Sequence, residues 1–523
     1  MNLIFKYGQD KLTASAALAL ARGQLRGVFS PDVRKRVENS RDAVDTIVER
    51  GKVVYGVNTG FGSLCNKIIS AEHTRRLQDN ILRSHSVGVG TDTPLEVAKL
   101  MLVLKINALA QGFSGISMQV LERLQWHLEN DIVPQVPQQG SLGASGDLAP
   151  LAHLCLPLIG LGRVWHEGGW QNTGAVLQSY DLQSIELGAK EGLALINGTQ
   201  FIAAWAVLGL ARLANCLDTA DIVGAMTLEG LLGSGAPFDP ALHQLRSYRG
   251  NRYVAHRLST LLHNSEMVAS HKDCGRVQDP YSLRCMPQVH GASRNAWLHL
   301  KELLEVELNS VTDNPIIFSA EKTVSGGNFH GQPLALPLDY NTLAAHELGN
   351  ISDRRIYLLL EGGVNGLPEL LMRDTGINSG FMIPQYTSAS LVSENKSLCF
   401  PPSADSIPSS LGQEDHVSMG SISSRRLNQV VGNLENILAI ELLCAAQAFD
   451  YRRPMRSSKL LDACHELVRS RIDHAEEDRV FAEDIQILGE IIRQQELVFL
   501  TQDIAQHEKL DLYGPYYEDF GLY

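Results

Sequence analysis

The chain lacks both the linkers that separate domains and the disulfide framework that stabilises a small fold. Its 523 residues include only eight cysteines, which show neither C-x-x-C spacing nor a paired framework. A chain of this length needs no disulfides to build a core. No low-complexity tract and no linker rich in proline, serine or glycine interrupts it. We therefore expect reduced thiols and one large, continuous subunit.

Positive charge is also scarce. Lysine and arginine total 45 against 58 acidic residues, which gives a formal net charge of −13 without any basic block. This balance argues against nucleic-acid binding. Residues 1–6 are too short an apolar segment for a signal peptide, so we expect a cytoplasmic protein. The uncharged run 192–211 has transmembrane length, but Asn197, Thr199 and Gln200 lie within it, and we interpret it as a buried helix rather than a membrane span.

Metal-binding patterns and strand-like segments are rare too. No set of histidine, cysteine or carboxylate residues has zinc spacing, so metal catalysis is not indicated. Only residues 52–55 and 315–318 read as short strands. Helical periodicity dominates instead, for example at Leu300, Leu304 and Leu308, which predicts one apolar helix face.

The apolar helices set the predicted fold. The stretch 201–217 is apolar nearly all round, so it needs partners on every side. We predict a mainly α protein with a long central helical bundle and a smaller, mixed N-terminal lobe. The expected divisions are an N-terminal lobe at 1–200, a central bundle with site loops at 201–509, and a C-terminal tail at 510–523.

One short segment can form an electrophile that no side chain supplies. Ala144, Ser145 and Gly146 lie within the sequence GSLGASGDLAPLAH, residues 140–153. If the Gly146 nitrogen attacks the Ala144 carbonyl carbon, and water is lost there and from Ser145, a 4-methylidene-imidazol-5-one (MIO) ring results. Gly146 suits this cyclisation because it adopts dihedral angles that a Cβ atom forbids. A built-in electrophile serves covalent catalysis.

Other interpretations apply to the same segment. A turn followed by a helix capped by Ser145 or Asp147 is the simpler interpretation of the tripeptide taken alone. A hydrolase nucleophile elbow, G-x-S-x-G, is disfavoured because Asp147 stands where the second glycine belongs. The surroundings of the tripeptide therefore decide its meaning.

Two glycine-rich loops present polar rings. Tyr55 begins the sequence YGVNTGFG, and His85 comes shortly before Gly88 and Gly90. A loop tyrosine is most often a packed aromatic whose hydroxyl group is hydrogen-bonded. The Tyr55 loop is not a phosphate loop, because no Gly-Lys-Ser/Thr follows it.

Charged side chains form two further candidate groups. Tyr281 and Arg284 lie one helical turn apart, and an arginine suits bidentate binding of a carboxylate, although a surface ion pair is its commoner role. Glu414 belongs to the cluster QEDHVSMG, residues 413–420. Acidic residues of this kind are also typical of a helix N-terminus.

Together these segments resemble the aromatic amino acid ammonia-lyases and aminomutases. The resemblance extends from Tyr55 to about Leu488, and in that family the Ala-Ser-Gly segment forms the MIO ring. It therefore implies the same ring at residues 144–146, with no external cofactor, and a homotetramer with active sites shared between subunits. The motifs that carry the resemblance are residues 140–153, 191–199, 281–290, 326–333, 393–396 and 413–420.

Within this family, two positions bear on the substrate. Tyrosine- and phenylalanine-selective lyases commonly carry His-Leu or Phe-Leu where this chain has Ser84 and His85, and they tend to place an amide at the position of Glu414. The resemblance thus implies conversion of L-histidine to trans-urocanate and ammonia, the first step of histidine degradation. The alternatives are a tyrosine or phenylalanine ammonia-lyase and a 2,3-aminomutase of the same family.

The resemblance also assigns roles. Tyr55 is the first candidate for the base that removes the β-proton and Glu414 the second, while Arg284 is expected to hold the substrate carboxylate and Asn197 to polarise the ring oxygen. The predicted catalytic set is Tyr55, Ala144, Ser145, Gly146, Tyr281 and Glu414. The predicted substrate-binding set is His85, Asn197, Gln278, Arg284 and Phe329.

Overall fold

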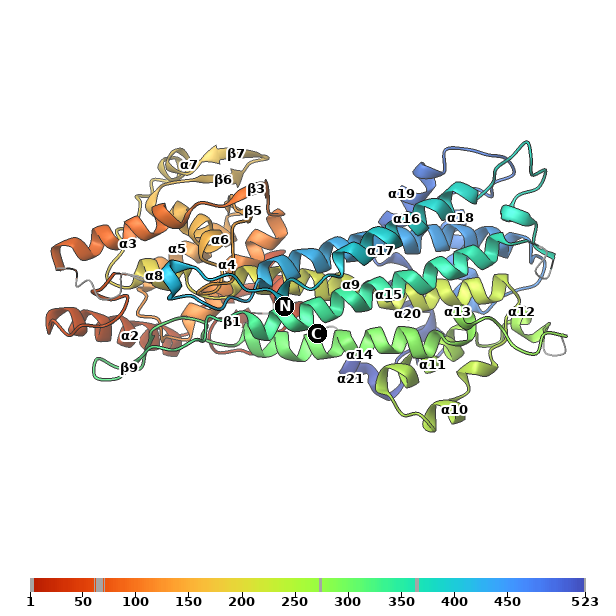
Figure 1. Cartoon of the computed structure of the whole chain (residues 1–523), viewed down its shortest axis with the longest axis horizontal. Helices are drawn as coiled ribbons and strands as arrows, with labels where there is room; N and C mark the ends of the chain where they lie inside the picture. Colours follow the sequence, from red (N-terminus) through yellow and green to blue (C-terminus); the bar gives the residue numbers. More distant parts are fainter. Residues whose placement is uncertain are drawn as a thin grey trace.

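Long helices dominate the structure, a computed structural model that describes residues 4–60, 62, 69, 71–271, 275–362 and 366–521. Figure 1 shows an elongated molecule in which a bundle of long helices extends from a smaller lobe formed by the N-terminal part of the chain. The prediction of a mainly α fold with a central helical bundle is confirmed. The longest bundle helices are α9 (Gln200–Gly230), α14 (Met286–Leu308), α15 (Gln332–Leu360) and α17 (Gly420–Asp450).

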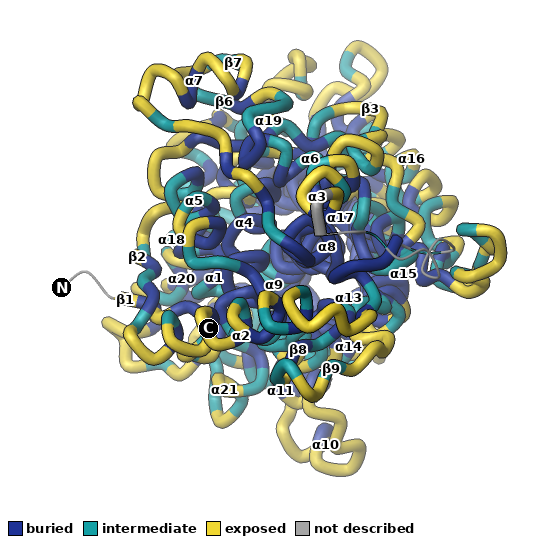
Figure 2. The backbone as a smooth tube through the Cα atoms, turned by 90° about the vertical axis from the view of Figure 1, so that its left-hand side faces the viewer, coloured by how far each residue is buried: buried dark blue, intermediate teal, exposed yellow. Residues whose placement is uncertain are grey.

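The bundle helices hold together through apolar faces. In α14, Leu300, Leu304 and Leu308 are buried, as their spacing predicts. Helices α9 and α17 are apolar and long enough to cross a membrane, but 83% and 78% of their most apolar windows are buried inside the fold. They are core helices, and Figure 2 shows the buried residues gathered in the interior with exposed residues in the surrounding loops.

The uncharged run 192–211 is buried but is not a single helix, which corrects the prediction. It spans α8 (Glu191–Ile196) and the start of α9. Asn197 between them is extended, with φ −74° and ψ 141°, and Gly198 has a φ of 120°. This backbone conformation interrupts the helical hydrogen bonds and leaves residues 197–199 free to pair with another segment.

The N-terminal lobe combines short helices with small sheets. Its antiparallel pairs are β3 (Val89–Asp92) with β5 (Pro137–Gln139), and β6 (Arg163–His166) with both β4 (Val133–Pro134) and β7 (Gly169–Asn172). Strands β1 (Ile4–Lys6) and β2 (Arg26–Val28) pair in parallel. Its other helices are α1 (Ala14–Ala21), α2 (Pro31–Glu49), α3 (Ala71–His85), α4 (Leu95–Ala110), α5 (Met118–Glu129), α6 (Leu148–Cys155) and α7 (Thr173–Ser179).

One of the two predicted strands is present. Residues 316–317 form β8, which pairs with β9 (Thr323–Val324). Residues 52–55 form no strand, because their backbone bonds to a nearby side chain instead of a neighbouring strand: Val54 N–H donates to Asn58 Oδ1 at 2.9 Å, and Asn58 Nδ2 donates to the Lys52 carbonyl at 3.0 Å.

Shorter helices cover the bundle, and the C-terminal segment packs on it. The segment expected to be a tail contains α21 (Tyr517–Phe520), and the Phe520 ring stacks on Tyr253 of α11 (Arg249–Leu261) at 4.8 Å. Residues 522–523 lie outside the described part of the chain. The remaining helices are α10 (Pro240–Gln244), α12 (Glu266–Ala269), α13 (Tyr281–Arg284), α16 (Met382–Leu398), α18 (Lys459–Arg469), α19 (Phe481–Arg493) and α20 (Glu496–His507).

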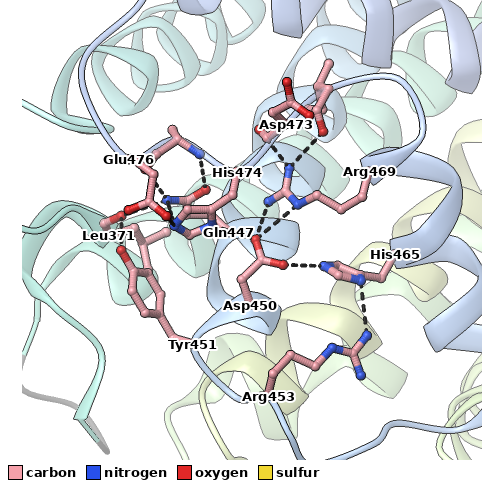
Figure 3. Close-up of polar contacts among 12 residues, drawn as sticks. Leu371, Gln447, Asp450, Tyr451, Arg453, His465, Arg469, Asp473, His474 and Glu476 are labelled. Carbon is pink, nitrogen blue, oxygen red and sulfur yellow. Dashed lines mark hydrogen bonds and ion pairs between the residues drawn. The ribbon is translucent and has the colours of Figure 1, made fainter.

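A polar cluster closes the C-terminal end of α17. Asp450 accepts hydrogen bonds from His465 Nε2 at 2.8 Å, Arg469 at 2.8 Å and His474 Nδ1 at 2.7 Å (Figure 3). Burial raises the pKa of the Asp450 carboxyl, but the hydrogen bonds from His465 and Arg469 outweigh it and hold this pKa below its usual range. The cluster fixes α18 and the following loop against α17.

None of the cysteines in the described part of the chain is paired with another. Those in the described residues are free thiols at Cys155, Cys216, Cys285, Cys399, Cys444 and Cys464. Cys65 and Cys274 lie outside the described residues.

Candidate active site

A cavity of about 330 Å³ lies between the N-terminal lobe and the loop that carries Ser410 and Glu414. Five of the predicted site residues line it, namely Tyr55, His85, Ser145, Asn197 and Glu414. They come from two loops, the end of α3, the turn before α6 and the break between α8 and α9. The other lining residues are Gly60, Gly62, Leu77, Asn80, Ile81, Ser84, Leu148, Leu193, Ile196 and Ser410.

The turn at residues 143–146 has a strained backbone. Ser145 has a φ of 50°, and Gly143 and Gly146 have φ values of 77° and 78°. A Cβ atom added to Gly146 would lie 2.1 Å from the carbonyl oxygen of Gly198. Bridges join Gly143 to Gly146 and Gly146 to Gly198. Only glycine therefore fits at position 146, and the non-glycine left-handed conformation at Ser145 stores strain in a cavity wall.

Asp147 holds this turn against the bundle. Its Oδ2 atom accepts hydrogen bonds from the Phe201 and Ile202 backbone N–H groups at 3.0 and 2.9 Å, at the start of α9. Its Oδ1 atom accepts from Ser141 Oγ at 3.1 Å. The residue does occupy the N-cap of α6 but makes no capping bond to that helix. Burial raises the pKa of the Asp147 carboxyl to about 7, against the opposing effect of these hydrogen bonds.

Glu414 reaches the Ser145 side chain across the cavity. Ser145 Oγ donates to Glu414 Oε1 at 3.3 Å, and Ser409 Oγ donates to Glu414 Oε2 at 3.2 Å. The Ser409 and Glu414 backbones also form an antiparallel bridge. A narrow loop thus holds the carboxylate beside the strained turn.

His85 and Tyr55 complete the polar wall. His85 ends α3, and its Nδ1 atom lies 3.0 Å from Ser84 Oγ. Burial lowers the pKa of the His85 imidazole, while the nearby Glu414 charge acts in the opposite direction. The Gly62 N–H donates to the Tyr55 hydroxyl oxygen at 3.2 Å. An imidazole, a carboxylate and a phenol therefore line the same cavity as Ser145.

The other predicted site residues do not line this cavity. Helix α13, with Tyr281 and Arg284, lies towards the opposite end of the bundle from α3 and α8 (Figure 1). Tyr281 is 71% exposed, and the Arg284 guanidinium stacks over its ring at 4.6 Å. Gln278 is exposed near the same end, and Phe329 is half-buried in a loop before α15. One chain alone does not bring the predicted carboxylate-binding arginine to Ser145.

Sequence reasoning missed a set of buried charges behind the cavity. Lys105, Lys190 and Asp313 are almost fully buried, and Asn197 contacts two of them. From sequence alone, an isolated charged residue is expected at the surface. Only Lys190 could have been noticed, because it stands directly before the 191–199 motif. Among the described residues, no group of three or more histidine, cysteine or acidic residues could hold a metal ion.

Comparisons with known proteins identify the family. The family model described as aromatic amino acid lyase matches residues 12–470. The chain belongs to the aromatic amino acid lyase family. A relative from Myxococcus xanthus (strain DK1622) named histidine ammonia-lyase is 47% identical over 490 residues, covering 94% of this chain and 96% of the relative.

Solved structures share the whole fold. A histidine ammonia-lyase from Trypanosoma cruzi superposes with a TM-score of 0.89 and 39% identity, covering 99% of this chain and 97% of that one. A tyrosine aminomutase from Streptomyces globisporus gives a TM-score of 0.91 and 34% identity, covering 98% of this chain and 100% of that one. The fold is therefore common to family members that differ in reaction.

Proposed function

We propose that this family member is a histidine ammonia-lyase, which converts L-histidine to trans-urocanate and ammonia in the cytoplasm. The observation that carries the proposal is the 3.3 Å contact between Ser145 and Glu414 in a cavity that His85 and Tyr55 also line. A volume of about 330 Å³ suits one small amino acid. The relative from Myxococcus xanthus, similar over nearly its full length, has the same name.

We infer that Ala144, Ser145 and Gly146 form the MIO ring. The positive φ values at Ser145 and Gly146 and the lack of room for a Cβ at Gly146 fit a turn that is cyclised through the Gly146 nitrogen. Asp147 holds the end of the turn through its bonds to α9. The ring would supply an electrophilic methylidene carbon, derived from Ser145, which converts the substrate nitrogen into a better leaving group.

The polar side chains suit an imidazole ring better than a plain aryl ring. His85 and Glu414 offer a hydrogen-bonding nitrogen and a carboxylate acceptor in one cavity. Such groups stay unpaired when an aryl ring occupies the space, and a pocket built to hydrogen-bond rejects analogues that cannot do so. This supports histidine over tyrosine or phenylalanine.

Two groups are candidates to remove the β-proton. Tyr55 is the first, because the Gly62 N–H at its oxygen stabilises negative charge there. Glu414 is the second, since its carboxylate already faces Ser145. If Tyr55 is the base, Glu414 binds the imidazole together with His85.

We propose that the active sites form in a homotetramer. Helix α13, which contains Tyr281 and Arg284, lies towards the far end of the bundle from α3 and α8 of its own chain (Figure 1). The counterparts of these residues and of Gln278 from neighbouring copies would therefore complete the cavity. Leu336, Tyr340 and Leu343 support assembly: they are 57%, 50% and 47% exposed and share one face of α15. Arg284 from a neighbouring copy would then pair with the substrate carboxylate, and Phe329 would help to close the pocket.

The direct test is product analysis. Purified protein mixed with L-histidine should generate the ultraviolet absorbance of urocanate and release ammonia in equal amounts, with L-tyrosine and L-phenylalanine giving little product. Faster turnover of either aryl amino acid would make the chain an aryl lyase. A β-amino acid product without net ammonia release would make it an aminomutase.

A further inference from the structure

A buried ion pair lies directly behind the cavity. Lys190 Nζ is 2.6 Å from Asp313 Oδ2, and the two side chains are 0% and 5% exposed. Neither residue lines the cavity. Removing two charges from water is unfavourable, and a buried pair is weak evidence of stabilisation. The presence of the pair is therefore explained better if it holds a neighbouring group in place than if it stabilises the fold.

The pair is bonded to the side chain of Asn197. Asn197 Nδ2 donates to Asp313 Oδ1 at 3.2 Å and to the Asn314 carbonyl oxygen at 2.7 Å. A primary amide has two N–H groups, and both are engaged here. Because Asn197 also lines the cavity, the atom it can still offer there is its oxygen, Oδ1.

The charge of Asp313 fixes this orientation. Burial raises the pKa of the Asp313 carboxyl, but Lys190 outweighs it and keeps this pKa below its usual value. An ionised carboxylate only accepts hydrogen bonds, so the amide nitrogen of Asn197 must face it. A flipped amide would bring two oxygens together in a buried site, which is strongly unfavourable.

The main chain of Asn197 is held independently. Lys105 Nζ donates to the Asn197 carbonyl oxygen at 2.6 Å, and Lys105 is only 2% exposed. The next residue, Gly198, accepts from the Asp147 N–H at 2.8 Å and pairs with Gly146. Asn197 is thus fixed relative to the Ala-Ser-Gly turn through both backbone and side chain.

We propose that the Lys190–Asp313 pair positions Asn197 as a hydrogen-bond acceptor for the amine of the substrate. Asn197 then orients the amine beside Ser145 and does not donate to the ring oxygen, contrary to the role expected from the resemblance. The identity of the amine-bearing substrate rests on the proposed function. Lys190 and Asp313 are positioning residues that act through Asn197.

The test compares two ligands that differ only in the amine. L-Histidine has the group, and 3-(imidazol-4-yl)propionate has the same ring and carboxylate without it. Binding is measured by calorimetry in full-length protein carrying Ser145→Ala, which cannot turn histidine over. The double variant Lys190→Met/Asp313→Asn removes both buried charges together, so that neither is left unpaired.

The double variant should weaken histidine binding on the order of tenfold, the effect of losing one well-placed hydrogen bond. Binding of the propionate should change less than twofold. The control is Glu435→Gln, which removes the charge of a buried carboxylate that pairs with the half-buried Arg212 (2.9 Å) elsewhere in the bundle. This change should alter neither affinity. Equal weakening of both ligands, or no change in either, would overturn the proposal.

A second variant covers the case in which the double variant does not fold. Asn197→Ala removes the acceptor itself and should give the same selective loss of histidine binding. If it weakens the propionate as much as histidine, the acceptor role is refuted. Product analysis of the enzyme without substitutions tests the proposed function separately. Absence of urocanate would refute that function, whereas selective loss of histidine binding in the variants would still support the role of Asn197.

Discussion

Gly146→Ala tests the geometry of the reactive turn. The new Cβ would lie 2.1 Å from the Gly198 carbonyl oxygen, and the residue would keep a φ of 78°. Left-handed backbone costs a non-glycine residue about 1–2 kcal/mol, and the overlap adds roughly 1–3 kcal/mol if the Asn197–Gly198 backbone moves away. That movement separates the two segments that shape the turn, so we expect loss of cyclisation and of turnover.

Gly168→Ala is the matched control. Gly168 has a similar φ of 81°, but a Cβ there meets nothing within 4 Å. This variant should lose only about 1–2 kcal/mol of unfolding free energy and should keep full activity and the dehydrated mass. Denaturant unfolding, intact mass and urocanate formation are measured for both variants. A Gly146→Ala enzyme that matures and turns over normally would refute the reasoning.

Three further outcomes follow from the contacts described. Glu414→Ala should reduce histidine turnover about 5- to 150-fold, the effect of about 1–3 kcal/mol for an unpaired polar group. Glu476→Ala, at an exposed site, should leave turnover unchanged, and equal rates for the two variants would show that Glu414 does not contact the substrate. Co-expression of inactive Tyr55→Phe and Arg284→Ala chains should restore part of the activity, assayed as urocanate, and no recovery in mixed tetramers would contradict shared sites. Burial lowers the pKa of His127 to about 4, so between pH 6.5 and 4 the unfolded chain binds more protons than the folded chain. The unfolding free energy should therefore fall by up to about 3 kcal/mol as the pH is lowered over that range. His127→Gln should abolish this part of the pH dependence measured by urea unfolding, and an unchanged dependence would contradict the prediction.

The helical core could be predicted because it follows from local periodicity. Leu300, Leu304 and Leu308 repeat on one face, and the structure buries all three. The segment 52–55 could not be predicted in the same way. Its valine and tyrosine residues favour a strand, but the Asn58 side chain takes the backbone bonds that a partner strand would need.

Local sequence alone predicts the site only where the reacting residues are adjacent in the chain. Ala144, Ser145 and Gly146 stand together in the chain, whereas Glu414 lies 269 positions from Ser145, and no local pattern joins them. The resemblance to a family supplied that connection. The buried Lys190–Asp313 pair escaped notice because its 123-residue separation is closed by tertiary packing alone.

The dependence of the whole account on Ser145 can be measured directly by intact mass. The protein with its natural sequence and the Ser145→Ala variant are purified in parallel. The mass of each is compared with the mass calculated from its sequence, and urocanate formation from L-histidine is measured for both. We predict that the protein with its natural sequence is active and two water molecules lighter than calculated, because cyclisation and loss of the Ser145 hydroxyl each release one. The Ser145→Ala protein should still fold, because the fold does not depend on the Ser145 hydroxyl, but it should form no urocanate. An active protein whose mass equals that of the unmodified chain would contradict the account.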